Sequence, residues 1–563
     1  MLHPLDPVMR KSVRVPLIVA SLVFGLAVHA AEPPRLAVVI TIDQFRGDYL
    51  ARFGPYFGED GFKRLLAGGT HFSNCHYRHG VMLTAPGHAS ILSGVFAHEH
   101  GVTGNDWLNR TTWEMVNSVE DTASPLVGIA PGELGPVAAA APAKPGRSPA
   151  NFKAETVGDQ LKHRFGAGTK VFAASNKDRS AILLGGQKAD AAYWDENGRI
   201  VTSRHYRAAL PAWVEAFNAE RQVHGAFGRT WERVLAPEVY EKVQGPDDVP
   251  GEGEAYGYGR RFPHAVDGGK PALSPAFFSA FDVSPFSAEF LGEFVQRAIR
   301  EEKLGRNTGT DLLCVSFSQV DALGHVFGPD SQEMMDAVVR LDRVLAALLA
   351  CIDREVGGDR CLFVLTADHG VSPLPERVAQ THPGTPAGRV KVADVDTAAK
   401  QALDAKYGAL AAKEVWFTRD GAGAHLRPAA LESKGVKAEE AAKVVQQAWA
   451  ALPFVAAAYT REELSSAPGA GNDVGSMMRR SYRLDGDRDV VFVVKPYYIL
   501  KSGAGSSHGA PYDYDQHVIL LWHGVGVPRG ERTERVAVED IAPTLAALLG
   551  VPAPPGAQGR RLF

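Results

Sequence analysis

Short uninterrupted runs of apolar residues alternate along this chain with segments in which apolar residues recur at helical spacing. The runs that we interpret as buried strands are LAVVITID (36–43), KVFAAS (170–175), DLLCVSF (311–317), CLFVLTAD (361–368) and HVILLWHG (517–524). Continuous apolar runs are typical of parallel sheets covered on both faces. Helical spacing is clearest from Met334 to Ile352, after the capping residues Asp330 and Ser331. The pattern predicts an α/β fold with a doubly wound, mostly parallel sheet and helices on both faces.

One long segment interrupts this alternation and predicts a second, smaller lobe. Residues 380–500 contain a hairpin pattern (EVWFTRDGAGAHL), a helical pattern (AEEAAKVVQQAWAAL) and a strand pattern (VVFVVKPYYIL). We expect an inserted α+β lobe there, and a main domain formed by residues 31–379 and 501–563. The Pro-, Gly- and Ala-rich stretch 130–150 is predicted to be a surface loop. The aromatic, irregular stretch 210–285 is predicted to form a cover.

The beginning of the chain has the pattern of a secretory signal. Three basic residues precede the 14-residue apolar run VPLIVASLVFGLAV, and small residues follow it. The run is shorter than the roughly 20 apolar residues that span a membrane. We predict a signal peptide at residues 1–30, cleaved after Ala30 or Ala31, with Met1 and Met9 both open as the start. The mature protein would be periplasmic or secreted, with no stable membrane span.

The composition excludes few functions, but it gives information about the class of partner. The chain has 563 residues, of which 45% are hydrophobic and 22% charged, with a formal net charge of -4. This balance gives no indication of a nucleic-acid partner. Export permits disulfides, and Cys351 and Cys361 flank a helix-to-strand connection where pairing stays an open possibility. None of the four cysteines has the CxxC spacing of a metal site.

Side chains of the type that bind metals gather at the ends of the predicted strands. Five such residues stand at strand ends and a sixth lies in GAGSSHGAPYD; the set is Asp43, Asp321, His325, Asp368, His369 and His508. In a doubly wound sheet, ligands bind at the carboxyl ends of the strands, so side chains at these ends lie at one edge of the sheet. Oxygen and nitrogen donors without thiolates suit zinc, with manganese or iron as poorer matches. Three carboxylates and three imidazoles divide naturally into two metal sites.

Thr84, in LTAPGHAS, supplies a hydroxyl that two metal ions could activate. Pro86 and Gly87 suit the opening of a helix, whose N-terminal N–H groups favour a phosphoryl oxygen. The alternative is that Thr84 is a helix cap. His88 is one helical turn away, but a structural role is the simpler interpretation of that residue. Two metals with a hydroxyl nucleophile are suited to displacement at phosphorus.

Seven motifs in order give a more specific resemblance, which spans nearly the whole mature chain. They are ITIDQFRGDYL, LTAPGHAS, HGVTGNDW, SNKDRSAIL, VDALGH, TADHG and SSHGAP. Together they resemble the alkaline phosphatase superfamily, and most closely its PafA-type bacterial branch with a threonine nucleophile. The resemblance implies two zinc ions. It assigns one ion to Asp321, His325 and His508, and the other to Asp43, Asp368, His369 and Thr84.

The same resemblance assigns three residues to the phosphoryl oxygens. Asn105 would donate to one non-bridging oxygen, and Lys177 and Arg179 would hold the others. A monoester dianion carries charge on three such oxygens, which suits a planar guanidinium and a compact ammonium. From the sequence alone, the simpler interpretation of KDR (177–179) is a solvated surface turn. Its place after the run KVFAAS favours a function.

These features predict an exported zinc-dependent phosphomonoesterase that acts through a phosphothreonine intermediate on small-molecule phosphate monoesters. The alternative is a phosphodiesterase or nucleotide pyrophosphatase of the same superfamily, which would share the metal ligands. Lys177 and Arg179 favour monoesters, since a diester needs room for a second substituent. A sulfatase would require Cys or Ser in a CxPxR-like context, which LTAPGH lacks. A non-catalytic exported protein that binds phosphate or metal is disfavoured, because every ligand position and the nucleophile are filled. We expect a monomer.

Overall fold

The computed structural model describes residues 1, 32–129, 145–469, 471–483 and 488–563, and Pro33–Phe563 forms one compact unit. The predicted signal peptide lies outside the described residues apart from Met1, as does most of the predicted loop at 130–150. In the part of the chain that the structure describes, no helix has both the length and the apolar character needed to cross a membrane.

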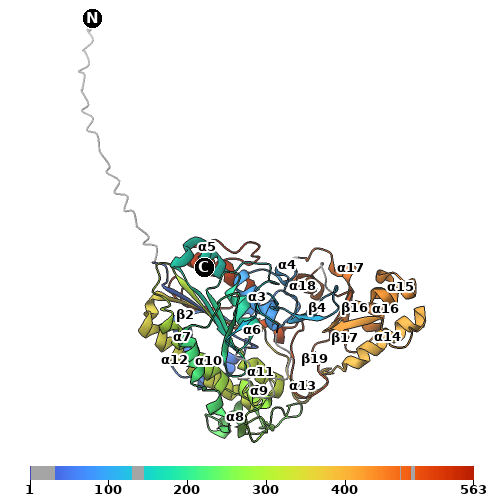
Figure 1. The fold of residues 1–563 in the computed structure, drawn as a ribbon, viewed down its shortest axis with the longest axis horizontal. Coiled ribbons are helices and arrows are strands. Elements are labelled where there is room, and N and C mark those ends of the chain that lie inside the picture. Colours follow the sequence, from blue (N-terminus) through green and yellow to red (C-terminus); the bar gives the residue numbers. More distant parts are fainter. Residues whose placement is uncertain (2–31, 130–144, 470, 484–487) are drawn as a thin grey trace. The chain divides into compact units, whose positions relative to one another are not determined.

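A ten-stranded sheet forms the centre of this unit (Figure 1). In spatial order its strands are β22 (Gly530–Arg532), β2 (Gly69–Phe72), β21 (Leu520–Gly524), β13 (Cys361–Thr366), β1 (Leu36–Ile42), β12 (Asp311–Phe317), β7 (Val171–Ser175), β8 (Ala191–Asp195), β9 (Ile200–Ser203) and β6 (Leu126–Val127). The five strands from β13 to β8 are parallel to one another. Every residue of β1, β12, β7 and β13 is buried, as their apolar sequences predict. The predicted α/β fold is confirmed.

The apolar run at 517–524 differs from the prediction in direction. It divides into β20 (His517–Val518), which pairs with β3 (Cys75–His76), and β21, which is antiparallel to β13. Burial of both faces makes a strand apolar throughout, whichever way it runs. The sequence therefore identified β21 as buried but did not determine its direction.

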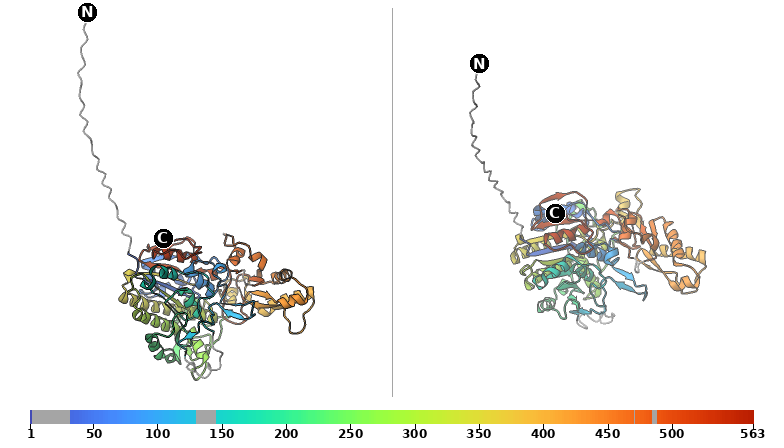
Figure 2. Two further views of the ribbon diagram at one scale, coloured as in Figure 1. Left: turned by 45° about the horizontal axis from the view of Figure 1, so that its top comes forward. Right: turned by 90° about the horizontal axis from the view of Figure 1, so that it is seen from above.

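Helices cover both faces of the sheet (Figures 1 and 2). One group packs together as α3 (Thr84–Ser93), α5 (Val157–Phe165), α6 (Asp178–Gly185) and α20 (Ile541–Leu548). The other contains α1 (Tyr49–Phe53), α2 (Phe62–Gly68), α10 (Phe286–Glu301), α11 (Gln319–Phe327) and α12 (Gln332–Glu355). The predicted cap of α12 is present, because the Ser331 side chain accepts a hydrogen bond from the backbone N–H of Met334 at 3.1 Å.

The segment at 380–500 builds a second sheet with its own apolar core. Its strands are β15 (Phe417–Asp420), β16 (Gly423–Leu426), β18 (Val490–Val494) and β17 (Val455–Thr460), and its main helices are α14 (Val392–Tyr407) and α16 (Ala438–Ala450). Trp416 and Trp449 are buried in that core. The views in Figure 2 show these elements, in orange, beside the main sheet. The hairpin, helix and strand predicted from the sequence are all present, and the domain boundaries stay a prediction.

Shorter elements complete the chain. They are β4 (Asp106–Leu108), β5 (Met115–Asn117), β10 (Arg229–Trp231), β11 (His264–Val266), β14 (Gly388–Arg389), β19 (Tyr498–Ile499), β23 (Val536–Ala537), α4 (Ala97–His100), α7 (Ala212–Ala219), α8 (Pro237–Gln244), α9 (Pro275–Val283), α13 (Pro375–Thr381), α15 (Pro428–Ser433), α17 (Arg461–Leu464), α18 (Val474–Arg480) and α19 (Asp513–Gln516). All four cysteines lie in described segments as buried free thiols. The pairing of Cys351 with Cys361 that the sequence left open is therefore not formed in this structure.

The stretch at 210–285 packs on α12 through buried polar groups. Asp336 of α12 is buried and accepts hydrogen bonds from the Trp231 indole at 2.7 Å and the Tyr240 hydroxyl at 2.5 Å. Near this contact, Glu252 is buried close to the buried carboxyl of Glu333. Burial, with the negative charge of Glu333 adding to it, raises the pKa of Glu252 to about 8.

We expect Glu252→Gln to remove a pH dependence from the stability of the protein. The pKa of Glu252 is about 8 in the folded protein and about 4.5 in the unfolded chain. The folded state therefore holds the proton more tightly, and its stabilising contribution, complete below pH 4.5, is lost as the pH rises to 8. The slope is up to about 1.4 kcal/mol per pH unit.

Urea unfolding at pH 5 and pH 8.5 measures this effect. Wild type should lose more stability than Glu252→Gln between the two values, and the exposed Glu254→Gln is the matched control. Parallel pH profiles for wild type and Glu252→Gln would contradict the assignment.

Candidate active site

The carboxyl ends of four adjacent parallel strands bring the predicted site residues to one edge of the sheet. Asp43 follows β1 directly, and its backbone N–H donates to the carbonyl of Phe317 at the end of β12. Asp368 comes two residues after β13, and Lys177 two residues after β7. The order β13, β1, β12, β7 places these ends side by side, as expected for ligand sites in doubly wound sheets.

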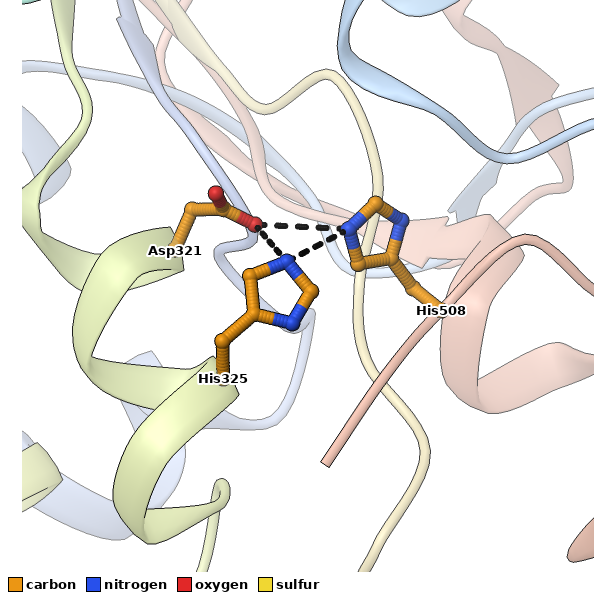
Figure 3. Close-up of side chains that lie close together, drawn as sticks. All are labelled: Asp321, His325 and His508. Atoms are coloured by element: carbon orange, nitrogen blue, oxygen red, sulfur yellow. Dashed lines mark hydrogen bonds and ion pairs between the residues drawn. The ribbon is translucent and has the colours of Figure 1, made fainter. Parts of the chain in front are cut away.

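Asp321, His325 and His508 form a first donor group (Figure 3). Asp321 Oδ1 lies 3.3 Å from His325 Nε2 and 3.4 Å from His508 Nε2. Asp321 and His325 occupy positions i and i+4 of α11, so one helix face presents both, as the sequence predicted. Figure 3 shows the two imidazoles and the carboxylate converging on one point from α11 and from the loop that carries His508.

The contacts of the two Nδ1 atoms determine which ring nitrogen of each histidine can bind a cation. His325 Nδ1 faces the carbonyl of Ser506 at 3.1 Å, and His508 Nδ1 faces that of Met82 at 2.7 Å. A carbonyl only accepts, so each Nδ1 carries the hydrogen and each Nε2 keeps a lone pair for a cation. Burial opposes ionisation of Asp321, but the positive charge of Lys177 holds its pKa well below the usual range.

Asp43, Asp321 and His369 form a second group, which shares Asp321 with the first. His369 Nε2 lies 3.4 Å from Asp43 Oδ1, and its Nδ1 donates to the Gly370 carbonyl at 2.9 Å. Burial lowers the pKa of His369 to about 3, which keeps the ring neutral with a lone pair on Nε2. The grouping differs from the prediction, which placed Asp368 here and Asp321 in the other group alone.

Asp368 nevertheless adjoins the second group. Its Oδ2 lies 3.5 Å from His369 Nε2 and 3.0 Å from His88 Nδ1, and its Oδ1 accepts from the backbone N–H of Gln44 at 3.1 Å. His88 also approaches the Thr84 carbonyl at 2.9 Å and the Ser316 hydroxyl at 2.8 Å. Both residues lie in the described part of the chain, and the His88 ring makes no hydrogen bond to the Thr84 hydroxyl. These contacts favour the predicted structural role of His88 over a role as base.

Unpartnered polar atoms at the centre of the site suit bound cations. Asp43 Oδ1, Asp368 Oδ2 and His369 Nε2 are fully buried and have no hydrogen-bond partner among the described residues. Buried groups of this kind are costly unless something compensates them. A carboxylate and imidazole donor set without thiolates fits zinc in its chemistry.

Lys177 and Arg179 stand beside these groups, at the beginning of α6. The Lys177 ammonium lies 2.6 Å from Asp43 Oδ2 and 2.5 Å from Asp321 Oδ2, and it thus joins the two donor groups. Burial opposes its charge, but the two carboxylates raise the pKa of Lys177. The Arg179 Nε is buried without a hydrogen-bond partner in the described part of the chain, and its Nη1 lies 3.9 Å from Asp178.

Thr84 is the first residue of α3 and is 1% exposed. The capping position belongs to Leu83, so Thr84 does not occupy the cap position that the sequence left as an alternative. Asn105 Oδ1 accepts from the backbone N–H of Ala85 at 2.9 Å, which ties the predicted oxygen donor to the first turn of the same helix. The structure thus brings Thr84, Asn105 and Asp368 to one end of α3.

Gln44 contacts both donor groups, and the sequence analysis did not identify it. Its side-chain amide donates to Asp321 Oδ1 at 2.6 Å, while its backbone N–H binds Asp368. The backbone of Gln44 has φ 67°, a conformation that is uncommon outside glycine and that clusters at functional sites. The sequence feature that could have identified Gln44 is its position next to Asp43. A Cβ on Gly324 would lie 1.8 Å from Gln44 Oε1, so a larger residue there would displace the Gln44 side-chain amide.

Comparison with known proteins identifies the family. The model of the type I phosphodiesterase / nucleotide pyrophosphatase family matches residues 37–467, which is more than half of the chain. The chain belongs to this family. Within it, alkaline phosphatase PhoV of Synechococcus elongatus is 31% identical over 94% of this chain and 92% of the relative. Alkaline phosphatase PafA of Elizabethkingia meningoseptica is 30% identical over 97% of this chain and 96% of the relative.

The solved structure of wild-type alkaline phosphatase PafA extends the comparison to three dimensions. It superposes with a TM-score of 0.85 and 28% sequence identity, over 94% of this chain and 98% of that chain. The similarity spans the main sheet and the segment at 380–500 alike. The predicted resemblance to PafA-type alkaline phosphatases, and with it the prediction of an enzyme of that class, is confirmed at the level of the family.

Proposed function

We propose that this member of the type I phosphodiesterase / nucleotide pyrophosphatase family is an exported, zinc-dependent phosphomonoesterase. It would hydrolyse small phosphate monoesters through a phosphothreonine intermediate on Thr84. The observation that supports this most directly is the shared position of Asp321. Its carboxylate belongs to both donor groups and contacts Lys177, so one site combines two cation-binding positions with a fixed positive charge.

The reaction assigned to these residues is an in-line displacement. The Thr84 oxygen attacks phosphorus, the ester oxygen leaves, and water then cleaves the phosphothreonine bond. Two zinc ions, held by the two donor groups and Asp368, would supply acidity to the threonine hydroxyl and charge stabilisation at the leaving oxygen. Thr84 stands at the N-terminus of α3, where the positive end of the helix dipole favours anions.

Asn105, Lys177 and Arg179 would hold the non-bridging oxygens and so select monoesters. A monoester dianion has one more negative oxygen than a diester and gains more from two cationic side chains. The second candidate function is hydrolysis of diesters or nucleotide pyrophosphates. Membership of the type I phosphodiesterase / nucleotide pyrophosphatase family supports it. The two functions share their metal donors, and the cationic pair distinguishes them.

We expect Lys177→Ala and Arg179→Ala each to lower kcat/KM for p-nitrophenyl phosphate about 100-fold, the size of a lost charge-assisted contact in a transition state. The loss for bis-p-nitrophenyl phosphate should be much smaller, because that substrate offers fewer charged oxygens. The measurement is the ratio of the two kcat/KM values in zinc-loaded wild type and variants. Equal losses on both esters would refute the assignment, and a wild-type preference for the diester would favour the second candidate.

The proposal also includes export of the protein, a content of two zinc ions and a monomeric state. The relatives PafA and PhoV support an activity of the alkaline phosphatase type. The signal peptide predicted at residues 1–30 supports a periplasmic or secreted location. Cell fractionation with N-terminal sequencing of the mature protein tests that location, and cleavage after neither Ala30 nor Ala31 would contradict the predicted processing.

A further inference from the structure

Residues 77–83, here named the Thr84 loop, connect β3 with the helix that begins at Thr84. Leu83 is the N-cap residue of α3, so the loop leads directly into the first turn of that helix. The carbonyl of Met82 accepts a hydrogen bond from His508 Nδ1 at 2.7 Å. The position of this loop therefore affects two parts of the site, the residue assigned as nucleophile and one member of the first donor group.

A buried hydroxyl from a distant part of the chain binds the backbone of the Thr84 loop. Ser481 follows α18 directly and is 3% exposed. Its Oγ accepts from the backbone N–H of Gly80 at 2.7 Å and from that of Val81 at 3.1 Å. It donates to the carbonyl of Met477 at 3.2 Å. Because a hydroxyl has one hydrogen and two acceptor positions, these three contacts use its full capacity.

The preceding residue, Arg480, binds the same loop at another point. It is 4% exposed, and its Nη1 donates to the carbonyl of Arg78 at 2.8 Å. Its Nη2 donates to the carbonyls of Gly469 and Gly471 at 2.6 Å and 2.7 Å. One guanidinium thus connects the Thr84 loop with the segment that precedes α18.

Apolar packing also holds the loop against the segment at 380–500. Val81 packs against a small core that comprises Leu464, Met478, Tyr482, Val491 and Val493. A Cβ on Gly80 would lie 2.7 Å from Met478 Sδ, so the loop and α18 approach each other closely. α18 also contacts α4, the helix that follows α3 (Figure 1). The segment at 380–500 therefore forms one wall of the loop that carries Thr84.

Ser465 provides a matched comparison within the same part of the chain. Like Ser481, it is the first residue after a short helix, and its Oγ donates to the carbonyl four residues earlier, that of Arg461, at 2.6 Å. Ser465 is exposed, whereas Ser481 is buried against the Thr84 loop. The two serines share the local bond to their own helix. The two bonds to the Thr84 loop distinguish Ser481.

We propose that Ser481 is a positioning residue for the reaction, because its hydroxyl holds the Thr84 loop and, through this loop, Thr84 and His508. The inference rests on the proposed function, which assigns the roles of Thr84 and His508. An alanine at position 481 would remove the acceptor of two consecutive backbone N–H groups. A displacement of about 1 Å at a reacting group can lower a rate by about 100-fold. The segment at 380–500 would thus contribute to the rate itself.

The kinetic test compares Ser481→Ala with Ser465→Ala in the full-length, zinc-loaded protein. A single turnover of p-nitrophenyl phosphate with enzyme in excess gives a rate constant that does not depend on the folded fraction. We expect Ser481→Ala to lower this rate constant about tenfold and KM to change less than about twofold. Ser465→Ala should behave as wild type, and Ser481→Thr, which keeps the hydroxyl, should retain most of the rate.

A second substrate separates Ser481 from the residues assigned to the phosphoryl oxygens. The loss in Ser481→Ala should be equal for p-nitrophenyl phosphate and bis-p-nitrophenyl phosphate, because Ser481 acts on the loop and not on the substrate. Lys177→Ala and Arg179→Ala should instead lose more activity on the monoester. A loss in Ser481→Ala confined to the monoester would overturn the positioning role.

Amide hydrogen exchange tests the position of the loop without any activity. Peptides that cover residues 77–83 should exchange faster in Ser481→Ala than in wild type and Ser465→Ala, with or without zinc, while β1 stays protected. Unchanged exchange of the loop, a wild-type rate constant, or faster exchange throughout the chain would overturn the inference. Absence of monoester hydrolysis in wild type would instead overturn the proposed function, and the exchange data would still show whether Ser481 holds the loop.

Discussion

Replacing Thr84 by alanine is expected to lower kcat for phosphate monoesters by at least about 10⁴-fold, the scale of losing a nucleophile. The reason is geometric as well as chemical. Thr84 is the first residue of α3, buried at the end of the helix that also carries His88, a neighbour of Asp368. No other hydroxyl among the sequence motifs has this position. Steady-state kinetics on p-nitrophenyl phosphate provides the measurement.

Two further experiments test this prediction. Thr84→Ser retains a hydroxyl and should keep most of the activity, so a loss as large as that of alanine would argue against a simple nucleophile. Acid quenching with radiolabelled substrate should trap phosphate on wild type and not on Thr84→Ala. Trapped label that remains in Thr84→Ala would place the covalent intermediate on a different residue.

Asp321→Asn is the second change for which we expect a large effect. The Asp321 carboxylate lies in both donor groups, and it also pairs with Lys177. An amide keeps the shape but not the charge, so the metal content should fall from about two zinc ions per chain to below about one, with activity reduced about 10³-fold. Metal analysis after dialysis against zinc measures the content directly. The stabilisation by zinc should fall as well, since a ligand at 1,000 times its Kd adds about 4 kcal/mol.

His325→Ala is the graded comparison for Asp321→Asn. His325 belongs to the first donor group and is absent from the second, so this variant should lose one ion and keep the other. Equal zinc contents in the two variants would show that Asp321 is not shared as the geometry indicates. Retention of full zinc content in Asp321→Asn would remove the carboxylate from the metal site altogether.

The local parts of the fold were predictable because each depends on a short stretch of residues. β1, β7, β12 and β13 lie within one or two residues of the predicted bounds, since burial on both faces leaves a continuous apolar run. The cap at Ser331 and the i, i+4 pair of α11 are local in the same sense. The direction of β21 was not predictable, because pairing partners distant in the sequence decide it.

The candidate site shows the same division. Strand ends predicted that Asp43, Asp368 and Lys177 gather at one edge, because parallel strands terminate together. The sequence did not indicate that Asp321 is shared by the two donor groups, nor that Gln44 connects Asp321 with Asp368. These relations depend on distances of a few ångströms between segments about 280 to 320 residues apart, which only packing determines.

The sequence by itself determined the fold class, the ordered motifs and the chemical types of the site residues, because patterns of burial and residue type are written locally. The tertiary structure alone decided which donors lie close enough to share a cation, that Thr84 does not cap its helix, and that Gln44 connects Asp321 with Asp368. The physical reason is that a side chain's type is encoded at its own position. Its neighbours are set by how strands and helices that are distant in the sequence pack together at the edge of the sheet.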